Sequence, residues 1–195
     1  LQKEGLKVAI LEADTLLNGT TGHTTAKVTA QHGLIYDELI QHFGEDRAKL
    51  YYQSADQSLQ FIKNLIQEKK IECDFSQEDA YIFATSDLDK NKIEKEAEAY
   101  QKLGIDGELA SSIPFDFEIK TALSMKNQAQ FHPLKYLKQL VLDFVEAGGS
   151  VYEATTASDI EEDGDHPKVM TRDGHRVACK HVIIASHFPF YDKKG

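Results

Sequence analysis

The stretch VAILEADTLLNGTTGHTTAKVTAQHG, residues 8–33, decides the fold expected for this chain. Its apolar Val-Ala-Ile-Leu run predicts a buried strand over Lys7–Ala13. The run ends at an acid, Glu12, and a loop rich in Gly and Thr follows over Asn18–Thr25. The function of the segment therefore depends on what this acid and this loop could bind.

An acid followed by such a loop has two explanations. In a dinucleotide fold, a carboxylate at the end of the second parallel strand accepts both hydroxyl groups of an adenosine ribose. The segment Gly19–Lys27 offers small residues that let backbone N–H groups approach phosphate oxygens, and hydroxyls that donate to them. A plain turn and helix cap, after a strand that simply ends in Glu12, explains the same residues without a ligand.

The composition fits a globular chain and excludes several classes of partner. Of the 195 residues, 41% are hydrophobic and 28% are charged, which is ordinary for a protein with a packed core. The formal net charge of −10 argues against a nucleic-acid partner, because such proteins usually carry a basic stripe. No apolar run approaches the roughly 20 residues of a membrane-spanning helix, and the first residues lack the order of a signal peptide. We therefore expect a cytoplasmic protein that binds neither nucleic acid nor membrane.

Hydrophobic periodicity predicts three helices after the opening loop. The first spans Asp46–Glu68, with apolar residues three and four positions apart. The second spans Asp87–Leu103, and Gly104 is its stop signal. The third begins at Pro133, where a first helical turn accepts proline, and ends at Gly148. The start of the chain, LQKEGLK, resembles the exposed end of a further helix that is capped by a glycine.

Short apolar or alternating segments predict strands between and after these helices. Asp173-Gly174 is typical of a hairpin turn, and HVIIAS, residues 181–186, is expected to be buried on both faces of a sheet. The fold class predicted is α/β, or α+β with mixed sheets. The predicted strands are residues 79–85, 117–125, 150–155, 157–161, 168–172, 176–180 and 181–186. The four segments between residues 150 and 180 are expected to form a meander.

The sequence gives no support for a disulfide framework, a metal site or a serine hydrolase. Cys73 and Cys179 lie far apart and form no Cys-x-x-Cys pair, so neither a disulfide framework nor a thiolate metal site is predicted. The eight histidines form no His-x-x-x-His pair and no His-Glu-x-x-His motif. No Gly-x-Ser-x-Gly elbow occurs either, which argues against a hydrolase.

Several segments resemble one superfamily of flavoenzymes, in the same order along the chain. LEADTLLNGTTGHTTAKVTAQHG resembles the second-strand and flavin-loop region of the D-amino acid oxidase and glycine oxidase superfamily of FAD-dependent oxidoreductases. FHPLKYLKQLVLDFVEAGGSVYEATTASDI resembles its substrate strand, Pro-started helix and next strand, and HVIIASHFPF occupies the place of its Ala-Thr-Gly strand end. The likeness is closest to a bacterial branch in which a Rieske iron–sulfur domain follows. Because the family's first strand and Gly-x-Gly-x-x-Gly turn would precede Leu1, we expect an internal fragment.

The resemblance implies an FAD site and the residues that would form it. Glu12 would bind the adenosine ribose. The residues implied near the adenine, or at the strand end that faces the cofactor, are Ala13, Asp14, Ala157, Ala185 and Ser186. The residues implied along the pyrophosphate, ribityl and ring side of FAD are Thr21, Gly22, His23, Thr24, Thr25, Ala26 and Lys27.

In that family the flavin carries the chemistry, since the carbon next to the substrate's amine passes a hydride to the ring. The resemblance thus implies oxidation of an amine or amino acid, with electrons passed to an acceptor. No catalytic residue is assigned, because the segments that complete the substrate side of the flavin would follow the strand at His181. A Rieske [2Fe–2S] cluster needs two Cys and two His in close motifs and would lie in a downstream domain. Without the glycine turn, the chain alone is expected to bind FAD weakly or not at all and to be inactive.

The resemblance also implies domain boundaries. Residues 1–75 would be a partial FAD-binding domain, residues 76–132 a substrate-domain-like insertion, and residues 133–195 the return to the FAD-binding domain. The whole would be an incomplete Rossmann-like domain with inserted substrate-domain strands and helices. The alternative is a non-catalytic binding or scaffold module, favoured by Ser186 and His187 where the family has Thr-Gly. An open sheet with unpaired edges also predicts that the chain associates with itself.

Overall fold

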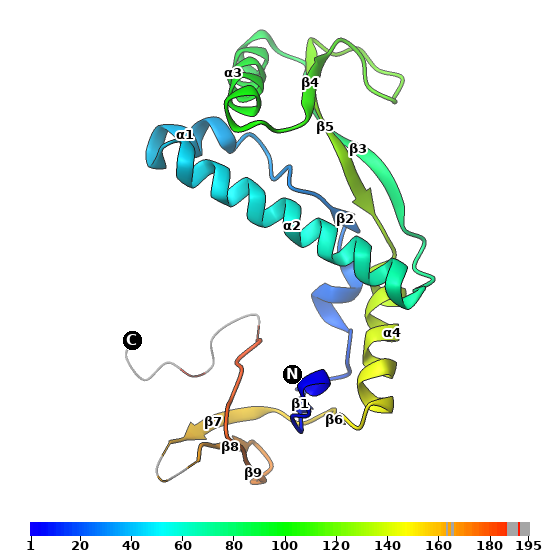
Figure 1. The fold of residues 1–195 in the computed structure, drawn as a ribbon, viewed down its shortest axis with the longest axis vertical. Helices are drawn as coiled ribbons and strands as arrows, with labels where there is room; N and C mark the ends of the chain where they lie inside the picture. The colour runs from blue at the N-terminus through cyan, green and yellow to red at the C-terminus, as the bar shows by residue number, and fades with distance from the viewer. Residues whose placement is uncertain (163, 165, 187–190, 192–195) are drawn as a thin grey trace. The chain divides into compact units, whose positions relative to one another are not determined.

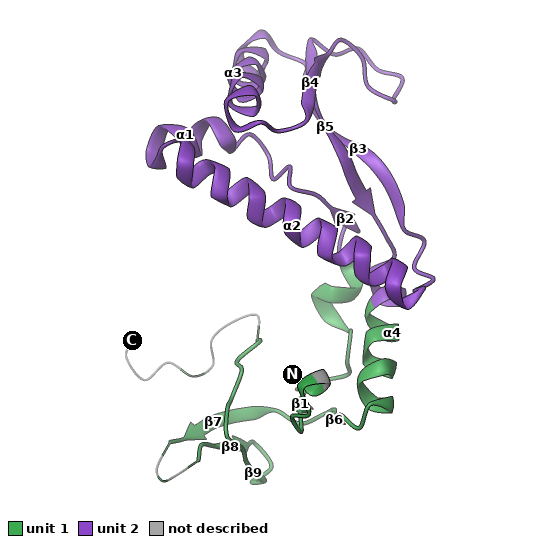
Figure 2. Cartoon of the chain, in the orientation of Figure 1, with its two compact units in different colours: residues 1–23, 137–195 green, residues 24–136 purple. Residues whose placement is uncertain are grey.

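The chain forms two compact units in the computed structural model, which describes residues 1–162, 164, 166–186 and 191 (Figures 1 and 2). Unit 1 combines Leu1–His23 with Leu137–Gly195, and unit 2 is the continuous segment Thr24–Tyr136. Compactness alone does not assign a segment to a cofactor domain or a substrate domain. The functional boundaries at 75/76 and 132/133 therefore stay a prediction.

Unit 2 is built on an antiparallel sheet whose central strand is β5 (Thr121–Gln130). β3 pairs with β5 along its whole length, with an irregularity between Glu78 and Ala80. β2 and β4 both pair with β5, β2 near its carboxyl end and β4 near its start. Five consecutive residues of β5, 121–125, are buried, as expected for a strand covered on both faces. The other strands of this sheet are β2 (Lys27–Val28), β3 (Ser76–Ala84) and β4 (Gly107–Ala110).

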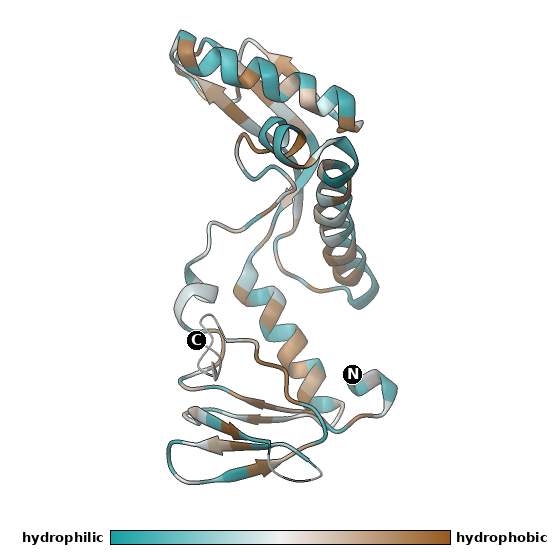
Figure 3. Ribbon diagram, turned by 90° about the vertical axis from the view of Figure 1, so that its left-hand side faces the viewer, coloured by the Kyte–Doolittle hydropathy of each residue, from teal (hydrophilic) through white to brown (hydrophobic). Residues whose placement is uncertain are grey.

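Two helices of unit 2 have the bounds expected from local signals. α3 spans Asp87–Leu103 as predicted, because the Ser86 Oγ accepts the Asp89 N–H at its start and Gly104 adopts a left-handed conformation at its end. α2 spans Glu45–Lys69, one residue longer at each end than predicted. Hydrophobic and hydrophilic residues alternate along the helical ribbons (Figure 3), as amphipathic packing requires.

α1 (Tyr36–Phe43) was missed by the sequence analysis, because its start depends on a residue from another helix. Its N-cap residue, Ile35, offers no side-chain acceptor. Glu96 of α3 supplies one instead: its carboxylate accepts the N–H groups of Ile35, Tyr36 and Asp37 at 3.1, 2.9 and 2.8 Å. Glu96 is only 1% exposed, and burial raises the pKa of its carboxyl, although the three N–H donors oppose that shift.

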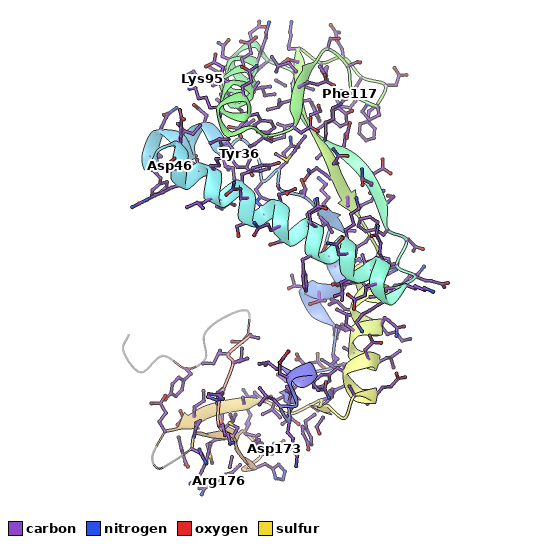
Figure 4. All side chains as sticks on the ribbon, in the orientation of Figure 1. Tyr36, Asp46, Lys95, Phe117, Asp173 and Arg176 are labelled. Atoms are coloured by element: carbon purple, nitrogen blue, oxygen red, sulfur yellow. The ribbon has the colours of Figure 1, made fainter. Side chains whose placement is uncertain are left out.

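The core of unit 2 lies between the helices and the sheet, and tyrosine rings form part of it. Tyr36, which is labelled in Figure 4, lies in this core. It makes edge-to-face contacts with Tyr51, Tyr52 and Tyr100, at centroid distances of 6.2, 6.0 and 5.6 Å. The Tyr36 hydroxyl donates to the Ala30 carbonyl at 2.6 Å. Burial raises the pKa of both Tyr36 and Tyr100 far above the ordinary value. These rings are therefore packing groups.

Unit 1 contains a parallel pair of strands, β1 (Ala9–Leu11) and β6 (Ser150–Tyr152), in the register Ile10 to Val151. The chain enters β1 through a short 3₁₀ turn ended by Gly5 in the left-handed conformation, so the predicted glycine cap is confirmed. The other elements are the 3₁₀ turns η1 (Gln2–Glu4) and η2 (Gly19–His23), most of α4 (Pro133–Glu146), and the strands β7 (Ala157–Glu161), β8 (Lys168–Thr171) and β9 (Arg176–Ala178).

Three of the four strands predicted as a meander, β7, β8 and β9, pair antiparallel with a turn at Asp173-Gly174. The segment expected to be its first strand, residues 150–155, instead forms β6 over residues 150–152 and pairs in parallel with β1. The strand predicted over 181–186 is wrong: these residues form no strand, and Ile183 is 70% exposed. A parallel strand requires a neighbour for its N–H and C=O groups, and no described strand pairs with this segment. The strand predicted over 117–125 begins only at residue 121 and continues to residue 130.

Among the residues that the structure describes, none of the helices combines the length and apolarity that a membrane crossing requires. The mixed α/β architecture itself agrees with the fold class predicted from the sequence.

Candidate functional site

Glu12 leaves β1 at the carboxyl end of the parallel β1–β6 pair. Its backbone continues the ladder, because its N–H donates to the Tyr152 carbonyl at 2.9 Å and its carbonyl accepts the Thr155 N–H at 2.8 Å. Its side-chain Oε1 accepts the Asp14 N–H at 2.9 Å. Within the described residues, Oε2 makes no hydrogen bond. One carboxylate oxygen is therefore fixed to the backbone, and the other can accept a hydroxyl group.

The loop after Glu12 is held by the segment that follows β6. The Asp14 carbonyl accepts the Ala154 N–H at 2.9 Å, and the Leu16 N–H donates to Glu153 Oε1 at 2.7 Å. Ala154 has a φ of 48°, a left-handed conformation that non-glycine residues rarely adopt. All of these residues belong to unit 1, so this part of the candidate site is built within one compact unit.

The Gly/Thr loop begins as the 3₁₀ turn η2 and contains no buried residue. Gly19 has a φ of 65°, and the His23 Nδ1 lies 2.6 Å from its carbonyl oxygen. Since a carbonyl only accepts, this contact requires His23 to carry a proton on Nδ1. The Thr21, Gly22 and His23 implied along the cofactor thus form an exposed or half-buried turn in unit 1.

The second half of the loop, Thr24–Lys27, belongs to unit 2. Thr24 Oγ1 accepts the Ala26 N–H at 2.9 Å, and Ala26 has a φ of 62°. The Ala26 carbonyl accepts the Phe131 N–H at 3.1 Å, and Lys27 pairs with Gln130. The end of the loop is therefore anchored on β5 through β2.

Three implied residues remain. Ala157 lies close in sequence to a residue that binds the Glu12 backbone, whereas Ala185 and Ser186 do not form the expected strand. Ala157 begins β7, two residues after the Thr155 whose N–H binds the Glu12 carbonyl. Ala185 and Ser186 are exposed and outside any strand. His187, which the sequence analysis weighed with them, lies outside the described residues.

Glu153 and Ala154 are the residues of this region that the sequence analysis missed. Both lie in a segment predicted as ordinary strand, and neither belongs to a recognisable motif. Their role depends on a partner almost 140 positions away in the sequence, since Glu153 and Leu16 are 137 residues apart. The parallel pairing of β1 with β6 is the signal that could have identified them.

No metal centre competes with this interpretation in the part of the chain that the structure describes. Those residues contain no group of three or more His, Cys, Asp or Glu side chains arranged to hold a metal ion. Cys73 is buried and Cys179 is half-buried, and both are free thiols.

Comparison with protein families identifies the class to which this architecture belongs. A model described as FAD dependent oxidoreductase (DAO) matches residues 1–188, nearly the whole chain. The chain belongs to this FAD-dependent oxidoreductase family. The membership in the D-amino acid oxidase superfamily that the sequence predicted is therefore confirmed.

Two curated relatives of this chain are much longer than the chain itself. The chain is 48% identical over 195 residues to the Putative Rieske 2Fe-2S iron-sulfur protein YhfW of Bacillus subtilis, covering 100% of the chain and 38% of that protein. It is 24% identical over 194 residues to the Probable oxidoreductase OrdL of Haemophilus influenzae, covering 96% of the chain and 44% of that protein. The chain therefore spans less than half the length of these relatives.

Solved structures share the fold at low sequence identity. Glycine oxidase from Geobacillus kaustophilus matches with a TM-score of 0.76 and 20% identity, over 95% of this chain and 50% of that one. L-amino acid deaminase from Proteus vulgaris matches with a TM-score of 0.68 and 14% identity, over 94% of this chain and 42% of that one. The predicted FAD-binding, Rossmann-like fold class is confirmed by these likenesses.

Proposed function

We propose that this chain carries the adenosine end of an FAD site, together with substrate-domain elements, in an oxidoreductase that oxidises an amine or amino acid. The observation that carries the proposal is Glu12, which ends a parallel strand in a family member and keeps Oε2 available to a ligand. A carboxylate in this position suits a ribose, whose two hydroxyls both donate hydrogen bonds.

Three residues close to Glu12 along the chain or through its backbone contacts would border the adenine of FAD. Ala13 and Asp14 leave the strand directly after the acid and are exposed, and Ala157 follows the Thr155 that binds the Glu12 backbone. These three positions would border the adenine, with Ala157 contributing its backbone. When bound, FAD would accept a hydride from the carbon next to the substrate's amine.

The Gly/Thr loop would receive the phosphate and flavin portions of the cofactor. The residues of this loop that would line the cofactor are Thr21, Gly22, His23, Thr24, Thr25, Ala26 and Lys27. Small side chains leave backbone N–H groups accessible to phosphate oxygens, and the Lys27 ammonium adds a positive charge. Ala185 and Ser186 complete the proposed set at the segment after β9.

An iron–sulfur electron acceptor is a further part of the proposal. The relative from Bacillus subtilis is named as a Rieske 2Fe-2S protein, and this chain has only two cysteines, which lie far apart in the sequence. Because a Rieske cluster needs two Cys and two His in close motifs, it would occupy a separate domain. The absence of nucleic-acid and membrane partners, the cytoplasmic location and self-association of the chain stay predictions.

The first test is an ultraviolet–visible spectrum of the natural gene product, purified without added cofactor. A flavin spectrum that is bleached by a glycine, proline or other amino-acid substrate under anaerobic conditions supports the proposal, and extra broad absorption supports an attached iron–sulfur cluster. Glu12→Ala should then lower the affinity for FAD more than the affinity for FMN, which lacks the adenosine. A colourless protein that takes up no added FAD would favour the non-catalytic binding module instead.

A further inference from the structure

The loop that carries the candidate ribose acid is held by four hydrogen bonds to one short segment. Three are backbone bonds, between Glu12 and Tyr152, Glu12 and Thr155, and Asp14 and Ala154, at 2.9, 2.8 and 2.9 Å. Backbone bonds of this kind follow from strand pairing and need no particular side chain. The fourth bond, from the Leu16 N–H to Glu153 Oε1 at 2.7 Å, requires an acceptor side chain.

The segment that bears Glu153 is itself fixed. The Thr155 hydroxyl donates to the Glu153 carbonyl at 2.8 Å, and the left-handed Ala154 ends the regular ladder after β6. The backbone of Glu153 is therefore held in place, and its side chain accepts the Leu16 N–H from this position. The turn after β1 therefore has two hydrogen bonds to side chains. The Asp14 N–H donates to Glu12 Oε1, and the Leu16 N–H donates to Glu153 Oε1.

We propose that Glu153 is a positioning residue for the adenosine end of FAD. By accepting the Leu16 N–H it fixes the turn over Glu12–Leu16, and this turn orients the Glu12 carboxylate through the Asp14 amide. Glu153 does not contact the nucleotide. This inference rests on the proposed function, since it concerns the same adenosine site.

The test is a calorimetric titration of the cofactor-free natural gene product with ADP, which carries the adenosine and pyrophosphate but no flavin. The variants are Glu153→Ala, which removes the acceptor, and Glu153→Gln, which keeps an acceptor oxygen. Glu146→Ala, at the exposed end of α4, removes one negative charge from the same unit without this contact. Hydrogen exchange of the β8–β9 hairpin of unit 1, which makes none of these four bonds, reports whether unit 1 of each variant is folded.

We expect Glu153→Ala to weaken ADP binding about tenfold, the effect of about 1.4 kcal/mol and of the order of one hydrogen bond to a carboxylate. Glu153→Gln should stay within about twofold of the wild type, and Glu146→Ala should bind ADP as the wild type does. The Leu16 amide should exchange with solvent faster in Glu153→Ala only. In a Glu12→Ala background, Glu153→Ala should have little further effect, because its influence passes through Glu12.

The outcomes separate this inference from the proposed function. Normal ADP binding by Glu153→Ala, or an equal loss in the Glu12→Ala background, overturns the positioning role and leaves the adenosine site standing. Failure of Glu153→Gln to restore binding overturns it as well, since an acceptor oxygen alone would then be insufficient. Failure of the wild type to bind ADP at all overturns the adenosine site and the positioning role together.

Discussion

The two units differ in how much apolar surface they bury, and the candidate ribose site lies in the poorer one. The buried apolar side chains of the described residues belong to unit 2, with the exceptions of Ile160 and Val169 in the meander of unit 1. Unit 2 is one continuous segment, whereas unit 1 joins both ends of the chain. The difference teaches that the well-packed scaffold and the candidate ribose-binding turn after β1 are separate parts, as is common for binding sites that need accessible backbone.

Hydrogen bonding shows the same contrast. β5 of unit 2 pairs with three strands, and the carboxylate of Glu96 satisfies three N–H groups at the start of α1. Unit 1 has a two-stranded parallel pair and a three-stranded meander. Because unit 1 has smaller sheets, we expect its backbone amides to be less protected against exchange with solvent than those of unit 2. Native-state hydrogen exchange measures this protection separately for each unit.

The largest expected difference comes from truncating matched apolar side chains in the two units. Leu123→Ala should lower the free energy of unfolding of unit 2 by about 3 kcal/mol, because Leu123 is 0% exposed and its removal leaves a cavity. Ile183→Ala in unit 1 should change stability by less than about 0.5 kcal/mol, since its side chain already faces solvent. Hydrogen exchange of both variants checks the pair, and comparable losses would contradict the contrast between the units.

Adding one methyl group to a glycine in each unit gives the next largest effect. In Gly107→Ala, the new Cβ would collide with the Ser124 carbonyl oxygen and lie 2.8 Å from a Tyr100 ring carbon, so we expect a loss of about 2 kcal/mol. In Gly149→Ala the collision is with the ring of Phe144, which is only half-buried and can turn aside, so the loss should be about 1 kcal/mol. Denaturant unfolding followed by circular dichroism ranks the two, and a costlier Gly149→Ala would reverse the comparison.

The free energy of unfolding of unit 2 should depend on pH because of the buried carboxyl of Glu96. Burial raises the pKa of its carboxyl above the ordinary 4.5, so folding favours the protonated form. That contribution is fully present below pH 4.5 and is lost as the pH rises through the raised pKa. Glu96→Gln should cost about 1 kcal/mol at low pH through weaker capping of α1, and the deficit should shrink as the pH rises.

Free energies of unfolding at several pH values test this sign. Glu98→Gln, at an exposed position of the same helix, is the matched control and should show no such trend. A deficit for Glu96→Gln that grows with pH would mean that the three backbone donors dominate over burial.

The smallest effect is expected at the left-handed Ala154 of unit 1. Ala154→Gly should stabilise unit 1 by about 0.5 kcal/mol, because glycine adopts a φ of 48° without strain. Ala178→Gly, in β9 at a position without positive φ, should instead destabilise the unit by a similar amount. Thermal unfolding of the two variants measures the difference, and destabilisation by both would argue that Ala154 is not strained.

The sequence by itself determined the elements whose signals are local. α3 was predicted at its observed bounds because its apolar residues recur at helical spacing and Gly104 ends it, and the hairpin of β8 and β9 was predicted from its turn at Asp173-Gly174. The position of Glu12 at the end of a strand was also evident, since apolar runs and their last residue can be recognised without a partner. Its binding role rests on the family resemblance and stays a proposal.

Only the tertiary structure decided the features that depend on distant partners. α1 was missed because its cap, Glu96, comes from another helix, and residues 181–186 were expected as a strand although no described strand pairs with them. The support of the Glu12 loop by Glu153 was invisible for the same reason. A helix satisfies its hydrogen bonds within a few residues, whereas a strand, a borrowed cap or a supporting carboxylate needs atoms that only folding brings together.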